Sequence, residues 1–133
     1  MKFFFDRNIA ARLARMLDQF DDVHTIRHHD DDGRFTPTTP DIEWLTALGH
    51  DDPSWVVVSA DGRILRNALE RQALDQANLK FVLFAPAWTR MKVHEWAWRI
   101  VRVWPEVTET VTHVRGRIFE MAGGRSYKVR RLE

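Results

Sequence analysis

The order of apolar and polar positions predicts a chain that alternates strands with helices. Lys2–Phe5 and Trp55–Ser59 are short runs of aromatic and β-branched residues bounded by polar residues, as expected for strands buried on both faces. Val23–Ile26 and Lys80–Phe84 have the same character and predict two further strands. Strands buried on both faces and separated by helices are typical of an α/β fold with a mainly parallel sheet.

The segments between these strands carry helical signals. Asn8 is a candidate N-cap for a helix, because an apolar stripe with helical spacing follows it: Ile9, Leu13, Met16, Leu17 and Phe20. Thr39 as N-cap and Pro40 at the first helical position predict a second helix that ends at Gly49. The remaining elements expected are helices over Ile64–Asn78, Met91–Trp104 and Val107–Val114, with Pro105 between the last two, and a β-hairpin from Arg117–Met121 and Ser126–Leu132.

Length and composition favour one globular domain. The chain has 133 residues, of which 44% are hydrophobic, and it contains no cysteine. A disulfide scaffold and thiolate-based catalytic or metal sites are therefore excluded. We expect a single domain over residues 1–133, with 105–133 as a helix and hairpin extension. Because the N-terminus has a strand pattern and no apolar run approaches membrane-spanning length, we expect a cytoplasmic protein with no membrane partner.

The charge is unevenly distributed although the formal net charge is only +1. Asp18–Asp32 is rich in acids and histidines, and Arg115–Arg131 is basic. A basic tail is compatible with a nucleic-acid partner, but many such tails only provide solubility. His28–Asp32 offers imidazoles and carboxylates to a metal, yet adjacent residues on a loop rarely converge on one ion. A solvated loop is the favoured interpretation of that segment.

Acidic residues follow two of the predicted strands directly. Asp6 comes after the first strand, and Asp61 comes two residues after Ser59. Because ligands of open α/β sheets bind beyond the carboxyl ends of parallel strands, these two carboxylates are expected to meet at one sheet edge. The helix that begins at Pro40 carries Asp41 and Glu43, which point in different directions because they are two residues apart. Only one of them is expected to join the other acids as a direct ligand.

Clustered carboxylates repel each other, so three or four of them normally need a cation to be stable. Oxygen-only ligands suit Mg²⁺ or Mn²⁺, which would activate a water and stabilise the charge that develops on a phosphodiester. Arg63 and Arg66 follow Asp61 closely and are candidates for holding phosphates. Each acid also has a simpler interpretation: Asp61-Gly62 is a common turn dipeptide, and acids in a first helical turn interact favourably with the helix dipole.

The order and spacing of several motifs resemble the PIN-like domains, specifically the branch of VapC-type toxin nucleases. The motifs are Phe4-Phe5-Asp6-Arg7-Asn8, Thr39-Pro40-Asp41-Ile42-Glu43-Trp44, Val57-Val58-Ser59-Ala60-Asp61-Gly62-Arg63-Ile64, Arg66-Asn67 with Glu70, and Phe84–Trp88. The resemblance covers nearly the whole chain and is weakest after Pro105. It implies a PIN-like three-layer α/β/α fold.

The same resemblance implies a Mg²⁺- or Mn²⁺-dependent ribonuclease. Asp6, Glu43 and Asp61 would bind the metal, and Asp41 would assist or position a water. Asn8, Arg63 and Arg66 would then orient the carboxylates or the scissile phosphate. A toxin role implies a small antitoxin partner, and the apolar surfaces would permit a homodimer.

One position departs from the family pattern. Larger PIN nucleases often have a further acid shortly after the equivalent of Asp61, and here Arg63 stands two residues on. Glu70 is a candidate substitute from the next helix. The missing acid keeps open an alternative function, a catalytically weak or inactive module that binds RNA or a protein. A third alternative, an aspartyl-phosphate receiver domain, is disfavoured because no lysine ends the strand at Phe84.

Overall fold

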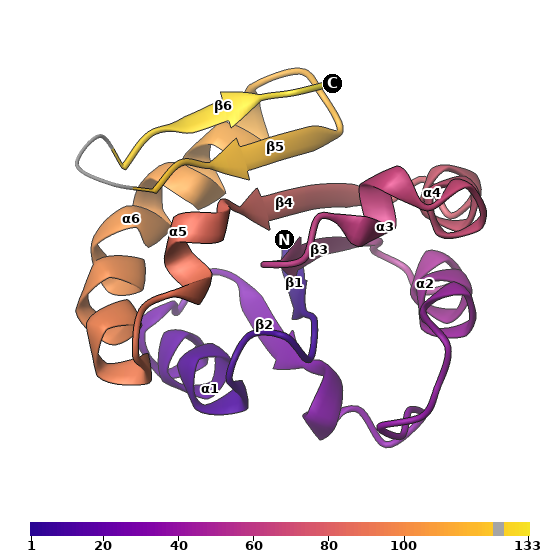
Figure 1. Cartoon of the computed structure of the whole chain (residues 1–133), viewed down its shortest axis with the longest axis horizontal. Helices are drawn as coiled ribbons and strands as arrows, with labels where there is room; N and C mark the ends of the chain where they lie inside the picture. The colour runs from indigo at the N-terminus through magenta and orange to yellow at the C-terminus, as the bar shows by residue number, and fades with distance from the viewer. Residues whose placement is uncertain (124–126) are drawn as a thin grey trace.

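Residues 1–123 and 127–133 are described by a computed structural model of the chain, in which one six-stranded sheet forms the centre (Figure 1). The strand order is β2-β1-β3-β4-β5-β6; β1 to β5 run parallel, and β6 is antiparallel to β5. The strands are β1 (Lys2–Phe5), β2 (Thr25–His28), β3 (Trp55–Ser59), β4 (Lys80–Phe84), β5 (Ile118–Met121) and β6 (Val129–Arg131). The predicted mainly parallel α/β sheet is confirmed.

Helices cover both faces of this sheet. The helices are α1 (Ala11–Phe20), a 3₁₀ turn η1 (His29–Asp31), α2 (Asp41–Gly49), α3 (Arg63–Arg66), α4 (Ala68–Gln76), α5 (Pro86–Thr89) and α6 (Val93–His113). In Figure 1 α1, α5 and α6 lie on one side of the sheet, and α2, α3 and α4 lie on the other. The arrangement is the three-layer α/β/α architecture that the sequence predicts.

Two hydrophobic cores lie on the two sides of the sheet because successive strand residues point to opposite faces. Phe3 and Phe5 of β1 join the core under α1 and α6, whereas Phe4 joins the core under α2 and α4. In β3, every residue from Trp55 to Ser59 is buried. The continuous apolar runs seen in the sequence are therefore explained by strands that pack helices on both faces.

Two helical predictions are wrong in their boundaries. The predicted Ile64–Asn78 helix is divided at Asn67, whose side chain accepts hydrogen bonds from the backbone N–H groups of Leu69 and Glu70 and so begins a new helix, α4. Conversely, α6 continues through Pro105 to His113. Residues on both sides of the proline, such as Trp104 and Val107, are buried in the same core, and this packing offsets the cost of a helix-internal proline.

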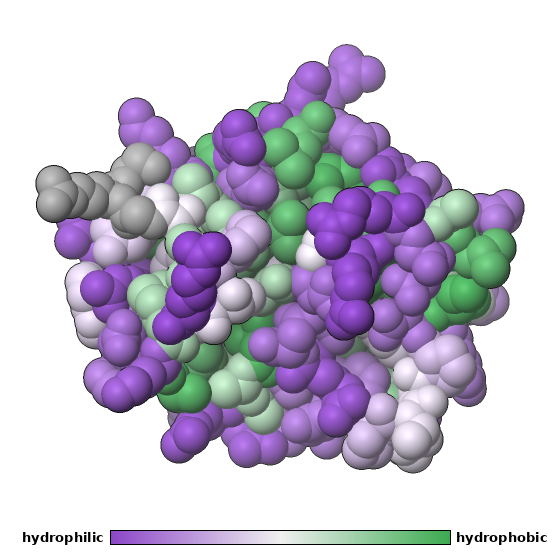
Figure 2. Space-filling model, in the orientation of Figure 1, coloured by the Kyte–Doolittle hydropathy of each residue, from purple (hydrophilic) through white to green (hydrophobic). Residues whose placement is uncertain are grey.

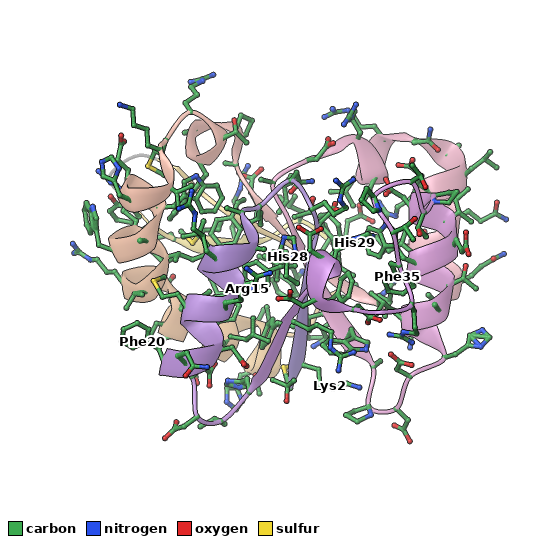
Figure 3. All side chains as sticks on the ribbon, turned by 90° about the horizontal axis from the view of Figure 1, so that it is seen from below. Lys2, Arg15, Phe20, His28, His29 and Phe35 are labelled. Atoms are coloured by element: carbon green, nitrogen blue, oxygen red, sulfur yellow. The ribbon has the colours of Figure 1, made fainter. Side chains whose placement is uncertain are left out.

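The prediction of a solvated loop at His28–Asp32 is also wrong. His28, His29 and Asp32 are all buried, and β2 runs on to His28 instead of ending at Ile26. Figure 3 shows His28 on the side of α1 and His29 beside Phe35, so the two consecutive histidines lie on opposite faces of the sheet. His28 Nε2 lies 2.6 Å from the Ile9 carbonyl oxygen, and the Asp30 N–H donates to His28 Nδ1. These two bonds assign the ring proton to Nε2.

The predicted C-terminal hairpin is present as β5 and β6, although its predicted second strand begins at Ser126, outside the described residues. Several arginines of this basic region are paired with acids. Arg130 binds Glu120, and Arg117 binds Asp75. The basic character of the tail is thus partly neutralised within the fold, which weakens the interpretation of the tail as a nucleic-acid site.

Candidate functional site

The strand order reverses at β1, and we call the sheet edge beyond the carboxyl ends of β1 and β3 the crevice. From β1 the chain first adds β2 on one side of it. It then crosses over to add β3 on the other side, so the direction in which strands are added reverses at β1. Ligands of open α/β sheets bind at such a reversal, outside the carboxyl ends of the strands. Asp6 follows the end of β1 there, and its N–H donates to the carbonyl of Val58 in β3 at 2.9 Å. This contact places Asp6 beside the end of β3, the strand after which Asp61 follows.

Asp6 is held in one orientation by a set of short hydrogen bonds. Its Oδ1 accepts from the Arg7 N–H at 2.7 Å, and its Oδ2 accepts from Asn8 Nδ2 and from Ser59 Oγ, both at 3.1 Å. Asn8 also accepts from the Ala60 N–H through Oδ1. Asn8 is therefore no helix cap, since α1 begins only at Ala11. Its side chain instead ties the end of β1 to the end of β3.

Asp6 is only 7% exposed, and its pKa is raised from 3.8 to about 6, chiefly by this burial. The negative charges of Asp41 and, to a smaller extent, Asp61 contribute to the rise, against the lowering effect of the Arg7 N–H and Ser59 hydrogen bonds. A carboxyl that two other acids repel lies within electrostatic reach of both. The three acids thus come from three distant parts of the sequence to one region.

Asp61 is bound to Arg63 through both carboxylate oxygens. Oδ1 accepts from the Arg63 backbone N–H at 2.9 Å, Oδ2 accepts from Arg63 Nε at 2.7 Å, and Arg63 Nη2 forms an ion pair with Oδ2 at 2.6 Å. These bonds hold the pKa of Asp61 below its ordinary value. Asp61 is consequently ionised and turned toward its own arginine.

The structure distinguishes the two acids at the start of α2. Asp41 lines a cavity of about 300 Å³ together with Asp61, Arg63, Asn67 and Glu70, which we call the acidic cavity. Trp44 Nε1 donates to Asp41 Oδ1 at 2.9 Å and fixes its position. Glu43 is exposed and does not line this cavity. Asp41, predicted only to assist, therefore occupies the position expected of Glu43.

Glu70 is the fourth acid of the acidic cavity. Partial burial raises its pKa, and the charges of Asp41 and Asp61 raise it further. The break at Asn67 turns α4 so that its first turn carries Glu70 to the cavity. Arg66 precedes this break, and an added Cβ at Gly62 would lie 3.2 Å from its Nη1. Arg66 is thus next to Asp61, whose pKa it helps to lower. Figure 2 shows hydrophilic residues over α3, the helix that carries both arginines.

The donor set at this edge fits a hard divalent cation, because it consists of carboxylate oxygens without thiolates. Among the described residues, however, no three acids or histidines are arranged as a set that could hold a metal ion. Asp61 Oδ2 contacts the Arg63 guanidinium instead of another acid. The acids are gathered at the crevice without converging on one point.

Two further residues belong to this region that sequence reasoning did not assign to it. Ser59 Oγ contacts Asp6, Asn8 and the Asp61 N–H, and so connects all three. Its signal in the sequence is a hydroxyl that ends a buried apolar run. His29 is buried beside Phe35 and Trp44, and the charges of Arg7 and Asp41 affect its pKa, which burial lowers. No sequence pattern distinguishes His29 from a loop histidine.

A family model described as a PIN like domain matches residues 1–86. The chain belongs to the PIN-like domain family. The match includes β1, α2, β3 and β4, and with them Asp6, Asp41, Asp61 and Glu70. The fold of this PIN-like domain is therefore of the nuclease type, as the motifs in the sequence predict. No curated protein and no solved structure matches the chain.

A search of the described residues for membrane-spanning helices finds no candidate. Even α6, with 21 residues, lacks the required apolar window.

Proposed function

We propose that this PIN-like domain is a metal-dependent ribonuclease that hydrolyses RNA phosphodiesters. The observation that carries the proposal is the meeting of Asp6, Asp41 and Asp61 at the β1–β3 crevice, where the two other acids raise the pKa of Asp6. Charges that repel each other at the functional edge of the sheet are stabilised by a divalent cation. Membership of a nuclease-type family supports the same chemistry.

The residues divide into three roles in this proposal. Asp6, Asp41 and Asp61 would hold Mg²⁺ or Mn²⁺, with Glu70 completing the set and exposed Glu43 outside it. Asn8 and Ser59 position Asp6 through their hydrogen bonds. Arg63 and Arg66 lie next to the acids and would bind the phosphate of the RNA. Bound metal would supply Lewis-acid stabilisation of the phosphate and a water of lowered pKa.

The biological setting we propose is a toxin whose small antitoxin partner blocks the crevice. Expression of the wild-type chain is then expected to arrest growth, whereas Asp6→Asn, which removes one ligand charge, is expected to be tolerated. Growth curves at matched protein levels measure this difference. Equal toxicity of the two proteins would contradict the toxin role.

The direct test is Mn²⁺-dependent cleavage of a panel of structured and single-stranded RNAs by the purified protein. Wild type is compared with Asp6→Asn and Asp61→Asn, and with Asp22→Asn, an exposed acid in the groove between α1 and α6, as the matched control. We expect wild type and the control to cleave, and each site variant to lose cleavage at least about a hundredfold. Cleavage that survives in both site variants would exclude this site.

A second candidate function is a PIN-like module that binds RNA or a protein without catalysis. Two observations favour it. The acids of the described residues do not converge as a metal site, and Asp61 is paired with Arg63. A measurement of metal binding distinguishes the nuclease from the non-catalytic module. Calorimetric titration with Mn²⁺ that shows no binding to wild type would favour the module.

A further inference from the structure

We propose that Arg63 is the resident cation of the acidic cavity and competes with the divalent metal for Asp61. The inference rests on the proposed metal site and assigns Arg63 a role that precedes substrate binding. Metal binding would require Asp61 to exchange its guanidinium partner for the ion. The same exchange would free Arg63, so that its charge becomes available to a phosphate only after metal has bound.

The contacts of Asp61 carry this proposal. Both oxygens are engaged by one residue, through the Arg63 backbone N–H at 2.9 Å, Nε at 2.7 Å and Nη2 at 2.6 Å. The guanidinium contacts Oδ2 through two of its nitrogens, so a metal ion that binds Oδ2 would compete with it for the same oxygen.

The position of Arg63 supports a role beyond a local ion pair. Arg63 lines the acidic cavity together with Asp41 and Glu70, and both acids act electrostatically on its guanidinium. It therefore places a positive charge among carboxylates that would otherwise only repel each other. A cation is needed there on electrostatic grounds, and the chain supplies one from the position where family members often carry a further acid.

The Arg63 side chain can also be released from Asp61 at low cost. Its side chain is 79% exposed, so release of the guanidinium into water costs little beyond the lost contacts. An exposed ion pair is typically weak, which makes it a contact that a divalent ion can displace. The backbone N–H bond to Oδ1 remains after the side chain departs, and would keep Asp61 near the crevice.

The test is the affinity of the purified chain for Mn²⁺, measured by isothermal titration calorimetry in the absence of RNA. Because Arg63→Gln removes the competing cation, we expect the dissociation constant of this variant for Mn²⁺ to be about two- to fivefold lower, or more, than that of wild type. Arg63→Lys keeps the charge but loses the two-pronged grip, and is expected to lie between wild type and Arg63→Gln. Arg15→Gln is the matched control, because exposed Arg15 on α1 also binds an aspartate, Asp31, through Nε and Nη2, outside the acidic cavity.

A second measurement follows the exchange itself. The ¹⁵N–¹H signal of Arg63 Nε reports its hydrogen bond to Asp61, and addition of Mg²⁺ is expected to shift it and to speed its exchange with water. The corresponding signal of Arg15 is expected to stay unchanged.

The outcomes separate this inference from the proposed function. Equal Mn²⁺ affinity in wild type and Arg63→Gln, with an Arg63 Nε signal that Mg²⁺ leaves unchanged, would overturn the competition and leave the metal site standing. Weaker Mn²⁺ binding by Arg63→Gln would overturn it as well, because Arg63 would then support the site. Absence of Mn²⁺ binding by wild type and by Arg63→Gln would overturn both proposals.

Discussion

At the scale of single residues, the local sequence indicates which groups carry charge, and their neighbours decide what each charge does. Asp6 and Asp61 are both aspartates that follow a strand, yet the pKa of Asp6 is raised by burial and that of Asp61 is lowered by Arg63. The sequence predicts both as candidate ligands but does not distinguish their protonation. The difference arises from the burial of Asp6 and from the charge of Asp41, which the fold brings to Asp6 from elsewhere in the chain.

Substitution of Asp6 tests this electrostatic account through stability. The folded-state pKa of about 6 lies above the ordinary 3.8, so the contribution of Asp6 to stability is complete below pH 3.8 and is lost as pH rises through 6. The difference in the free energy of unfolding, Asp6→Asn minus wild type, is therefore expected to rise by about 3 kcal/mol between pH 3.5 and pH 7.5.

Urea denaturation of both proteins at several pH values without divalent metal measures that difference. Each protein is compared with the other at the same pH, so the remaining titratable groups largely cancel. A difference that stays constant across this range would show that Asp6 titrates normally.

The choice between Asp41 and Glu43 is testable with a matched pair of substitutions. Asp41→Asn is expected to weaken Mn²⁺ binding about tenfold or more, since Asp41 lines the acidic cavity, whereas Glu43→Gln is expected to change it less than about twofold. Calorimetric titration of the two variants measures both effects. A larger loss in Glu43→Gln would restore the assignment that the sequence first predicted.

At the scale of elements, α2 and α4 form the walls of the acidic cavity, and their close approach depends on Gly49. A Cβ added at Gly49 would lie 2.6 Å from Ala77 Cβ and 2.9 Å from Ala77 Cα, which is backbone and cannot move alone. The sequence explains Gly49 as a helix stop. The structure shows that it also lets α2 pack directly against the end of α4.

Gly49→Ala is accordingly expected to lower the free energy of unfolding by about 1–3 kcal/mol, because α2 must move away from α4. Gly33→Ala is the matched control, since no atom lies within 4 Å of the added Cβ there. Thermal or urea unfolding followed by tryptophan fluorescence measures both. Equal stability of the two variants would contradict the close packing of α2 on α4.

At the scale of the whole molecule, the proposed metal binding would be coupled to folding and to protons. A metal that binds only the folded chain stabilises it by about 2.7 kcal/mol at a hundred times its dissociation constant. Because Asp6 has a pKa of about 6, it must lose a proton before it can bind an ion at lower pH. Stabilisation by metal is therefore linked to pH.

We expect Mn²⁺ to raise the melting temperature more at pH 7.5 than at pH 5, with a dissociation constant about tenfold weaker at pH 5. Differential scanning fluorimetry over a series of Mn²⁺ concentrations measures the shift, and Asp61→Asn is expected to show none at either pH. Equal stabilisation of wild type at both pH values would show that Asp6 takes no part in metal binding.

The sequence by itself determined the α/β class, the parallel strands and the two strand-end acids, because these follow from local patterns of apolar runs and their polar boundaries. It also predicted β4 over the residues that the structure shows. Patterns of this kind are local, and a buried strand keeps its character whatever its neighbours are. The PIN-like family, which residues 1–86 match, followed from the spacing of the same motifs.

Only the tertiary structure decided which residues meet. Local signals ended a helix at Pro105 and treated His28–Asp32 as solvated, but burial of both segments in the packed layers overrides these preferences. The break at Asn67 carries Glu70 to the acidic cavity, α2 places Asp41 and not Glu43 in its lining, and Arg63 binds Asp61 there. The Asn67 cap and the Arg63–Asp61 pair are local contacts, but the meeting of Asp41, Asp61 and Glu70 at one cavity depends on packing between segments distant in sequence, which no local pattern encodes.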